Sequence, residues 1–259
     1  MKKITFPIES SEEDTVSPLH PDLGWFVKML IVIIIAIIFA VGGSYIFSRV
    51  LLSRIDLATE REYFGHMMID ETMKPFDLSS LQTLGITGAL SDYNIYLQDS
   101  QEANAFATLG GNIIVTSALL ENIKNEEELI FILGHERAHI ENRDVIQSFA
   151  QSMPIILTLQ SLGIDTGNSI TSISSILGNY ASREKESFAD DSGIIFLKSL
   201  GLNSACATGF FEQNKNGFES YVEIFSSHPV SGDRLRKLEE KKLSTEKICT
   251  PMSTYKSKK

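Results

Sequence analysis

Residues 134–139 read Gly-His-Glu-Arg-Ala-His, so two histidines stand four positions apart and a glutamate directly follows the first of them. On an α-helix, positions i and i+4 project from the same face, and His135 and His139 could therefore hold one metal ion through their ring nitrogens. Glu136 would point beside this pair, where its carboxylate could take a proton from a water molecule that the metal activates. The spacing therefore indicates metal-assisted hydrolysis, and zinc is the ion that it favours.

The residues before this motif indicate a helix that could carry it. Asn125 can cap a helix that begins near Glu126, and the acidic run 126–128 places negative charge on its first turn. Residues 129–133 read Leu-Ile-Phe-Ile-Leu, which is apolar on every side of a helix. We therefore expect the two histidines on a helix that is buried in its domain.

Two core histidines satisfied by backbone carbonyls are the alternative interpretation. A sequence of this composition, with 5 histidines, would contain such a motif by chance in roughly one case in a hundred. Unpaired imidazoles in an apolar environment are also costly. Both arguments favour the metal site.

A catalytic zinc needs a third protein ligand and an open fourth position. The longer metzincin pattern would place glycine at 142 and histidine at 145, but this chain has Asn142 and Val145. The third ligand must therefore come from another segment, and the charged, helical-looking stretch 181–193 is the candidate. Four acidic residues compete in it: Glu184, Glu186, Asp190 and Asp191.

Helical spacing favours Glu186 together with Asp190. These two lie four positions apart and hence on one face, so that one carboxylate could bind the metal while the other accepts a hydrogen bond from a ligand histidine. Glu184 and Asp191 fall on different faces. A salt-bridged surface helix is the alternative, because charge runs are usually solvated.

Alternating apolar and polar residues precede the motif helix. Two strand-like runs, residues 102–109 and 112–120, are separated by Gly110 and Gly111, which are typical of a turn. This pattern predicts a small antiparallel sheet. Combined with the helices, it predicts one mostly helical α+β domain.

Four segments resemble one known family. They are NAFATLGGNIIVTSALL at 104–120, HERAHIENRD at 135–144, SREKESFAD at 182–190 and SHPVSGDRLRKL at 227–238. In this order they are similar to motifs of the gluzincin metallopeptidases related to the CAAX prenyl endopeptidases and the HtpX heat-shock proteases. The resemblance covers roughly residues 60–240, and four ordered motifs are more specific than one. It implies a zincin-like fold and a peptidase activity.

The resemblance also implies the metal ligands. His135, His139 and Glu186 would bind one zinc ion, and Glu136 would activate the water. Asp190, four positions after Glu186, matches the family's aspartate and would accept a hydrogen bond from a ligand histidine.

Further implied roles fall on residues around the cleft. Asn104, Ala105 and Phe106 would form an edge strand, to which an extended substrate adds through main-chain hydrogen bonds. His228 would stabilise the developing oxyanion or shape the cleft. Arg234 would pair with an acid near the metal helix.

An apolar segment near the N-terminus predicts a membrane anchor. Residues 29–48 contain no charge over 20 positions, which at about 1.5 Å per residue crosses the roughly 30 Å core of a bilayer. A cleaved signal peptide is the alternative, but this run is long and follows an acidic tail. The expected organisation is an N-terminal tail at 1–24, a transmembrane helix at 25–48, a juxtamembrane helical connection at 49–85, a zinc metallopeptidase domain at 86–240 and a C-terminal tail at 241–259.

The side of the membrane on which the domain lies stays open. Lys28 precedes the apolar segment whereas Arg49, Arg54 and Arg61 follow it, which favours the cytoplasm. A single anchor with a soluble peptidase domain instead looks like the family's periplasmic or intermembrane-space members. We expect a bacterial inner membrane, with the periplasmic side favoured by this second argument.

The net charge and the two cysteines limit which partners and compartments the sequence allows. The net charge of −10 and a pI near 5.0 argue against nucleic acid. Cys206 and Cys249 could form one disulfide in an oxidising compartment or stay reduced in the cytosol. We expect protein or peptide substrates, with exposed or misfolded proteins at the bilayer cleaved in quality control. A proteolytically inactive, metal-stabilised scaffold or chaperone is the alternative, and it would need no base at Glu136.

Overall fold

The structure is a computed structural model, and it describes residues 23–52, 54–161, 182–207, 228, 234, 236, 237, 240 and 249–252. The expected N-terminal tail up to residue 22 and the expected C-terminal tail, apart from 249–252, lie outside the described residues. The described helices are α1 (Leu23–Leu52), α2 (Leu57–Phe64), the 3-10 helix η1 (Leu78–Ser80), α3 (Ile86–Ala89), α4 (Ser117–Asn122), α5 (Glu126–Glu141), α6 (Asp144–Ser161), α8 (Arg183–Ser199) and α9 (Ser204–Ala207). The described strands are β1 (Lys74–Pro75), β2 (Asn94–Gln98), β3 (Ala105–Thr108) and β4 (Asn112–Thr116).

Helix α1 contains the apolar segment. Among the described helices, this is the one that is long and apolar enough to cross a membrane by length and composition, over Leu23–Ile46. Large apolar side chains along it are exposed, Phe39 for example at 77%. Residues 1–42 separate as a unit of their own from residues 43–259.

The sheet has the strand order β1-β2-β4-β3. Strands β3 and β4 form the expected antiparallel hairpin, and the turn 109–111 between them contains Gly110 and Gly111, both at positive φ. The prediction of a wholly antiparallel sheet is wrong, because β2 pairs with β4 in parallel. After β2 the chain first forms β3 at the far edge of the sheet and then returns as β4, which lies between β2 and β3. The alternation of apolar and polar residues within a strand does not specify which strands lie beside it. The α+β class itself is confirmed.

Helix α5 begins where the sequence predicts. The side chain of Asn125 accepts a hydrogen bond from the backbone N–H of Glu128 at 2.9 Å, which satisfies one of the free donors of the first turn. Residues 129–133 are all buried. The prediction of a capped, buried helix is confirmed.

The three glutamates at the start of α5 are buried rather than solvated, with exposed fractions of 0 to 2%. Each carboxylate holds a different chain segment. Glu126 accepts hydrogen bonds from Thr83, Glu127 from Thr250, and Glu128 from the backbone N–H of the preceding loop. The acidic run therefore fastens the N-terminal end of the motif helix to its surroundings.

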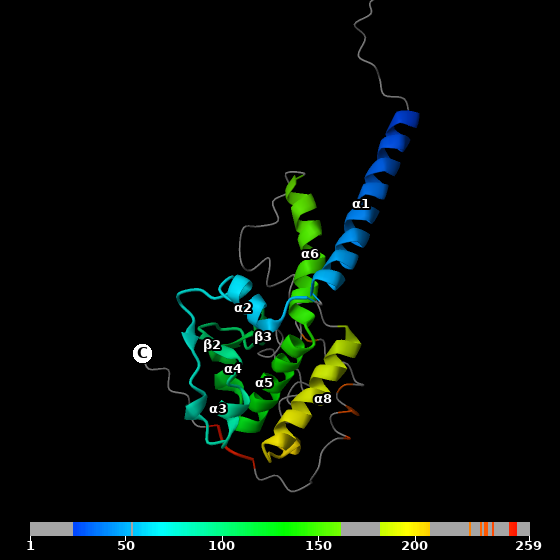
Figure 1. Cartoon of the computed structure of the whole chain (residues 1–259). Coiled ribbons are helices and arrows are strands. Elements are labelled where there is room, and N and C mark those ends of the chain that lie inside the picture. Colours follow the sequence, from blue (N-terminus) through cyan, green and yellow to red (C-terminus); the bar gives the residue numbers. More distant parts are fainter. Residues whose placement is uncertain are drawn as a thin grey trace, which may run out of the picture. The chain divides into compact units, whose positions relative to one another are not determined.

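Helix α8 lies alongside α5 (Figure 1). Two glycines permit this approach: a Cβ atom at Gly134 would lie 2.8 Å from Cδ1 of Phe196, and one at Gly193 would lie 2.9 Å from Cε2 of Phe131. The core fills the space between these helices and the sheet, with Ile113 and Val115 from β4 among its buried members. This close crossing brings the acidic face of α8 to the histidines of α5.

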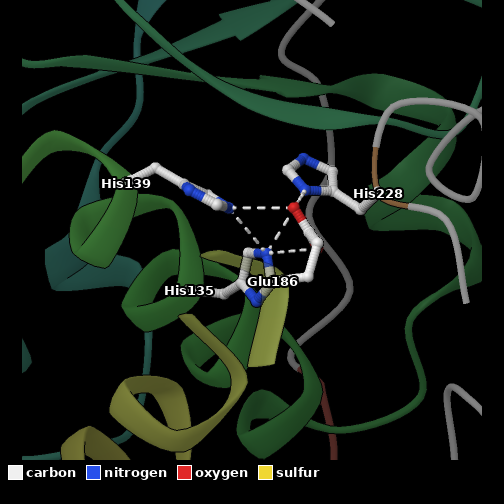
Figure 2. A group of neighbouring side chains, drawn as sticks. All are labelled: His135, His139, Glu186 and His228. Atoms are coloured by element: carbon white, nitrogen blue, oxygen red, sulfur yellow. Dashed lines mark hydrogen bonds and ion pairs between the residues drawn. The ribbon is translucent and has the colours of Figure 1, made fainter. Parts of the chain in front are cut away.

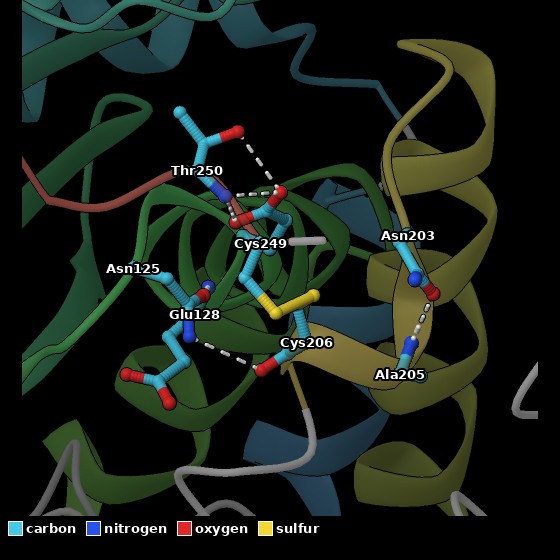
Figure 3. The surroundings of a disulfide bond; sticks show 8 residues. Asn125, Glu128, Asn203, Ala205, Cys206, Cys249 and Thr250 are labelled. Carbon is cyan, nitrogen blue, oxygen red and sulfur yellow. Dashed lines mark hydrogen bonds between the residues drawn. A yellow bond between two sulfur atoms is a disulfide. The ribbon is translucent and has the colours of Figure 1, made fainter. Parts of the chain in front are cut away.

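Cys206 and Cys249 form a disulfide that links α9 to the C-terminal segment (Figure 3). Thr250 lies against the start of α5, where its carbonyl accepts a hydrogen bond from the N–H of Glu126 at 2.9 Å. Pro251 forms an isolated β-bridge with Asn125. The C-terminal segment is thus fastened both covalently and by hydrogen bonds near the first turn of α5.

Candidate metal centre and active site

Four side chains converge in the cluster drawn in Figure 2. His135 and His139 extend from α5, Glu186 from the first turn of α8, and His228 from the segment after α9; one ligand atom of each lies within 4.8 Å of the others. The two histidine Nε2 atoms are 3.1 Å apart. Glu186 reaches both of them, with its carboxylate oxygens at 3.4 Å from His135 and 3.3 Å from His139.

The rear nitrogens of both histidines face carboxylates. Nδ1 of His139 lies 2.8 Å from Oδ2 of Asp144, and Nδ1 of His135 lies 3.1 Å from Oδ1 of Asp190. Such contacts orient an imidazole with its other nitrogen forward. Both forward Nε2 atoms point into the cluster, as two ligands of one ion would.

The cluster also contains a carboxylate oxygen that could bind a metal ion. Oε2 of Glu186 is buried and accepts no hydrogen bond of good geometry from the described residues, although Nη1 of Arg234 lies 2.9 Å from it. Two imidazole nitrogens and one carboxylate oxygen match the donor set of a catalytic zinc site. The residues present therefore fit such an ion.

Burial and charge oppose one another at these groups. Burial alone would lower the pKa of His135, but its contacts with Asp190 and Glu186 raise it to about 10. Burial would likewise raise the pKa of Glu186, whereas contacts with His135, His139 and His228 hold it far below its usual range. The carboxylates thus favour positive charge at the cluster, which a divalent cation also supplies.

Arg234, which follows His228 in the chain, contacts the acidic residues of α8 beside the cluster. Its guanidinium forms two hydrogen bonds with Asp190, from Nε to Oδ2 at 2.7 Å and from Nη2 to Oδ1 at 2.8 Å, and Arg234 is only 4% exposed. Nη1 also donates to the carbonyl of His228 at 3.1 Å. This planar, two-point contact fixes the segment that carries His228 against α8.

Glu136 lies between β3 and His228. Its Oε2 accepts a hydrogen bond from the backbone N–H of Ala107 at 2.8 Å, and its Oε1 lies 3.3 Å from Nε2 of His228. It is 2% exposed. The carboxylate is thus held by backbone on one side and faces the cluster on the other.

Strand β3 is an edge of the sheet within the described part of the chain. The backbone of Asn104, just before it, bonds inward to Thr116 of β4. Because inward and outward groups alternate in an antiparallel pair, the backbones of Ala105 and Ala107 face the open edge, and that of Phe106 faces β4. Of the three residues expected to meet a substrate, Ala105 therefore presents its main chain outward.

Asp144 was not assigned a role from the sequence. It is fully buried, and besides His139 it contacts Nζ of Lys185 and Nδ2 of Asn142, each at 2.9 Å from Oδ1. The signal for this contact in the sequence was the position of Asp144, five residues after His139. Since α5 ends just before it, periodicity along the helix could not place it behind that histidine.

The competing acids of 181–193 are not in the cluster. Glu184 is exposed and Asp191 is half-buried, whereas Glu186 and Asp190 are 1% and 3% exposed. The spacing argument therefore selects the same pair that the structure brings to the histidines.

Comparison with known proteins identifies relatives. The sequence model of peptidase family M48 matches residues 79–242. Metalloprotease YcaL of Escherichia coli (strain K12) is 28% identical over 166 residues, which is 60% of this chain and 64% of that protein. The beta-barrel assembly-enhancing protease of Yersinia pestis is 25% identical over 161 residues, 55% of this chain and 33% of that protein. The protease HtpX homolog of Pelotomaculum thermopropionicum is 29% identical over 192 residues, 56% of this chain and 68% of that protein. The chain thus spans 64% and 33% of the length of the first two relatives.

Proposed function

Because the chain belongs to peptidase family M48, we propose that it is a membrane-anchored, zinc-dependent metalloendopeptidase. The observation that carries the proposal is the convergence of His135, His139 and Glu186 with Glu136 beside them. Its substrates are exposed or misfolded proteins at the membrane, and its role is protein quality control. That the substrates are proteins or peptides is supported by the relatives, which are named as proteases.

We assign the three ligands to His135, His139 and Glu186. When bound there, zinc would polarise a peptide carbonyl and lower the pKa of a water molecule. Asp144 and Asp190 keep the two imidazoles turned toward the ion, and Arg234 holds Asp190 in place.

Glu136 is the proposed general base and then the general acid. Its carboxylate accepts a proton from the attacking water and delivers that proton to the leaving amine. The hydrogen bond from the Ala107 N–H fixes one carboxylate oxygen, so that the other is directed at the reacting atoms. We assign to His228 a hydrogen bond to the oxygen that gains negative charge, because its Nε2 lies beside the proposed base, 3.3 Å from Oε1 of Glu136.

Strand β3 is the proposed binding site for an extended substrate. Its open edge adjoins Glu136, as the hydrogen bond between Ala107 and that carboxylate indicates. A substrate segment that adds to this edge would place its peptide bonds along the base. Asn104, Ala105 and Phe106 define the start of this edge.

We propose the periplasmic side of a bacterial inner membrane for the domain. Disulfides persist in oxidising compartments, and the bond between Cys206 and Cys249 supports that side against the count of basic residues. Helix α1 is the proposed anchor, within the organisation of tail (1–24), span (25–48), connection (49–85), catalytic domain (86–240) and C-terminal tail (241–259).

The test compares the detergent-solubilised wild type with Glu136→Gln, for bound zinc and for cleavage of casein. We expect both proteins to hold about one zinc ion and only the wild type to cut, since glutamine cannot accept the proton. Equal cleavage by both would refute the role of Glu136. Zinc in both proteins and cleavage by neither would support the alternative, a metal-stabilised scaffold or chaperone.

A further inference from the structure

Helix α2 forms hydrogen bonds to the turn of the β3–β4 hairpin through two adjacent side chains. Oε1 of Glu60 accepts a hydrogen bond from the N–H of Gly110 at 2.8 Å, and Nε of Arg61 donates to the carbonyl of the same glycine at 3.1 Å. A Cβ atom at Gly110 would lie only 2.4 Å from Cα of Gly65, so the two backbones are in direct contact. Both polar groups of one turn residue are thus held by α2.

The second oxygen of Glu60 contacts the junction between α5 and α6. Oε2 lies 2.5 Å from Nη1 of Arg143, whose Nη2 donates to the carbonyl of Ile55 at 3.0 Å. Arg143 adopts a φ of 61°, which side-chain-bearing residues rarely do and which implies that its surroundings hold it there. Glu60 is only 3% exposed, and removing one partner of a buried ion pair leaves an uncompensated charge.

These two contacts lead to two different parts of the active site. Gly110 is three residues beyond Ala107, whose N–H holds the proposed base Glu136. Arg143 directly precedes Asp144, whose carboxylate orients a proposed metal ligand. One buried carboxylate therefore supports both the strand beside the base and the residue behind the metal.

We propose that Glu60 is a positioning residue of the active site and that α2 belongs to the catalytic unit. Helix α2 lies outside residues 79–242, to which the family model is matched, and it is the first described helix after the apolar one. The proposal rests on the proposed peptidase function, because activity is one of its readouts. According to this proposal, the segment between the proposed anchor and the catalytic domain helps to align the base with the metal ligands.

The test compares Glu60→Gln with Glu62→Gln in the full-length, detergent-solubilised protein. Glutamine at 60 keeps an oxygen for the N–H of Gly110 but loses the charge that faces Arg143. Glu62 lies on the same helix and is exposed, so its variant makes the same charge change away from the junction. At a temperature where all three proteins are folded, we expect kcat/KM of Glu60→Gln to fall by at least about tenfold, chiefly in kcat, and that of Glu62→Gln to stay at the wild-type value.

A second readout does not depend on activity. Hydrogen exchange of the backbone amides in 105–116 should be faster in Glu60→Gln than in the wild type and unchanged in Glu62→Gln, because the hairpin turn is less firmly held. A merely structural role of Glu60 would lower the unfolding temperature but leave kcat of the folded protein unchanged. Unchanged kcat in folded Glu60→Gln, or equal effects in both variants, would overturn the proposal.

Arg143→Gln keeps the test decisive where Glu60→Gln does not fold. It removes the same ion pair from the other partner, and we expect the same fall in kcat; wild-type kcat in this variant would contradict the proposal. Where both variants fold, the double variant should lose no more than the worse single variant, since both remove one interaction. A wild type that cuts no substrate would contradict the proposed function, and the exchange measurement would still show whether Glu60 holds the hairpin turn in place.

Discussion

Loss of the disulfide between Cys206 and Cys249 should destabilise the domain by an amount set by the chain that it closes. The two cysteines are 43 residues apart. Closing a loop of that length removes about 13 cal/mol/K from the unfolded chain, or about 4 kcal/mol at 25 °C, in the chain-entropy description. For a domain of this size, about 4 kcal/mol corresponds to roughly 8 to 16 °C in unfolding temperature.

Thermal unfolding followed by circular dichroism, with and without dithiothreitol, measures this shift without a mutation. The double variant Cys206→Ala, Cys249→Ala serves as control: it should unfold at the temperature of the reduced wild type and should not respond to dithiothreitol. Because the closed loop carries His228 and Arg234, we also expect the reduced protein to cut more slowly. Unfolding of oxidised and reduced protein at the same temperature would refute the reasoning, since the bond would then constrain nothing.

Three further substitutions test the contacts around the cluster. Asp144→Asn should weaken zinc binding by about 10- to 100-fold in a chelator competition, because His139 loses its charged partner, and unchanged affinity would contradict that role. His228→Ala should lower kcat by about 10²- to 10³-fold with zinc retained, whereas a rise in kcat would mean that this histidine blocks the metal's open position instead. Arg234→Met should cost about 3–5 kcal/mol in urea unfolding, because it leaves Asp190 buried without its partner, and a variant as stable as the wild type would refute this.

Local patterns sufficed to predict the motif helix and its partner. The cap at Asn125 and the apolar run after it are properties of neighbouring residues, and a spacing of four selected Glu186 with Asp190 on one helix face. These features depend on helix geometry alone. The structure agrees with them for that reason.

Contacts that depend on the path of the chain could not be predicted from the sequence. Asp144 lies behind His139 only because the chain turns sharply after α5, and Glu60 reaches its partners from 50 or more residues away. The parallel pairing of β2 with β4 likewise depends on the path between strands. Periodicity reports which face of an element is buried but not what covers it.

The zinc content of two helix α8 variants tests the central claim most directly. Glu186 and Glu184 lie two positions apart on α8, the first buried in the cluster and the second exposed. Purified wild type and Glu184→Gln should each hold about one zinc ion per chain, while Glu186→Gln should lose it under the same dialysis. Zinc held equally tightly by all three proteins would contradict the assignment of Glu186 as the third ligand.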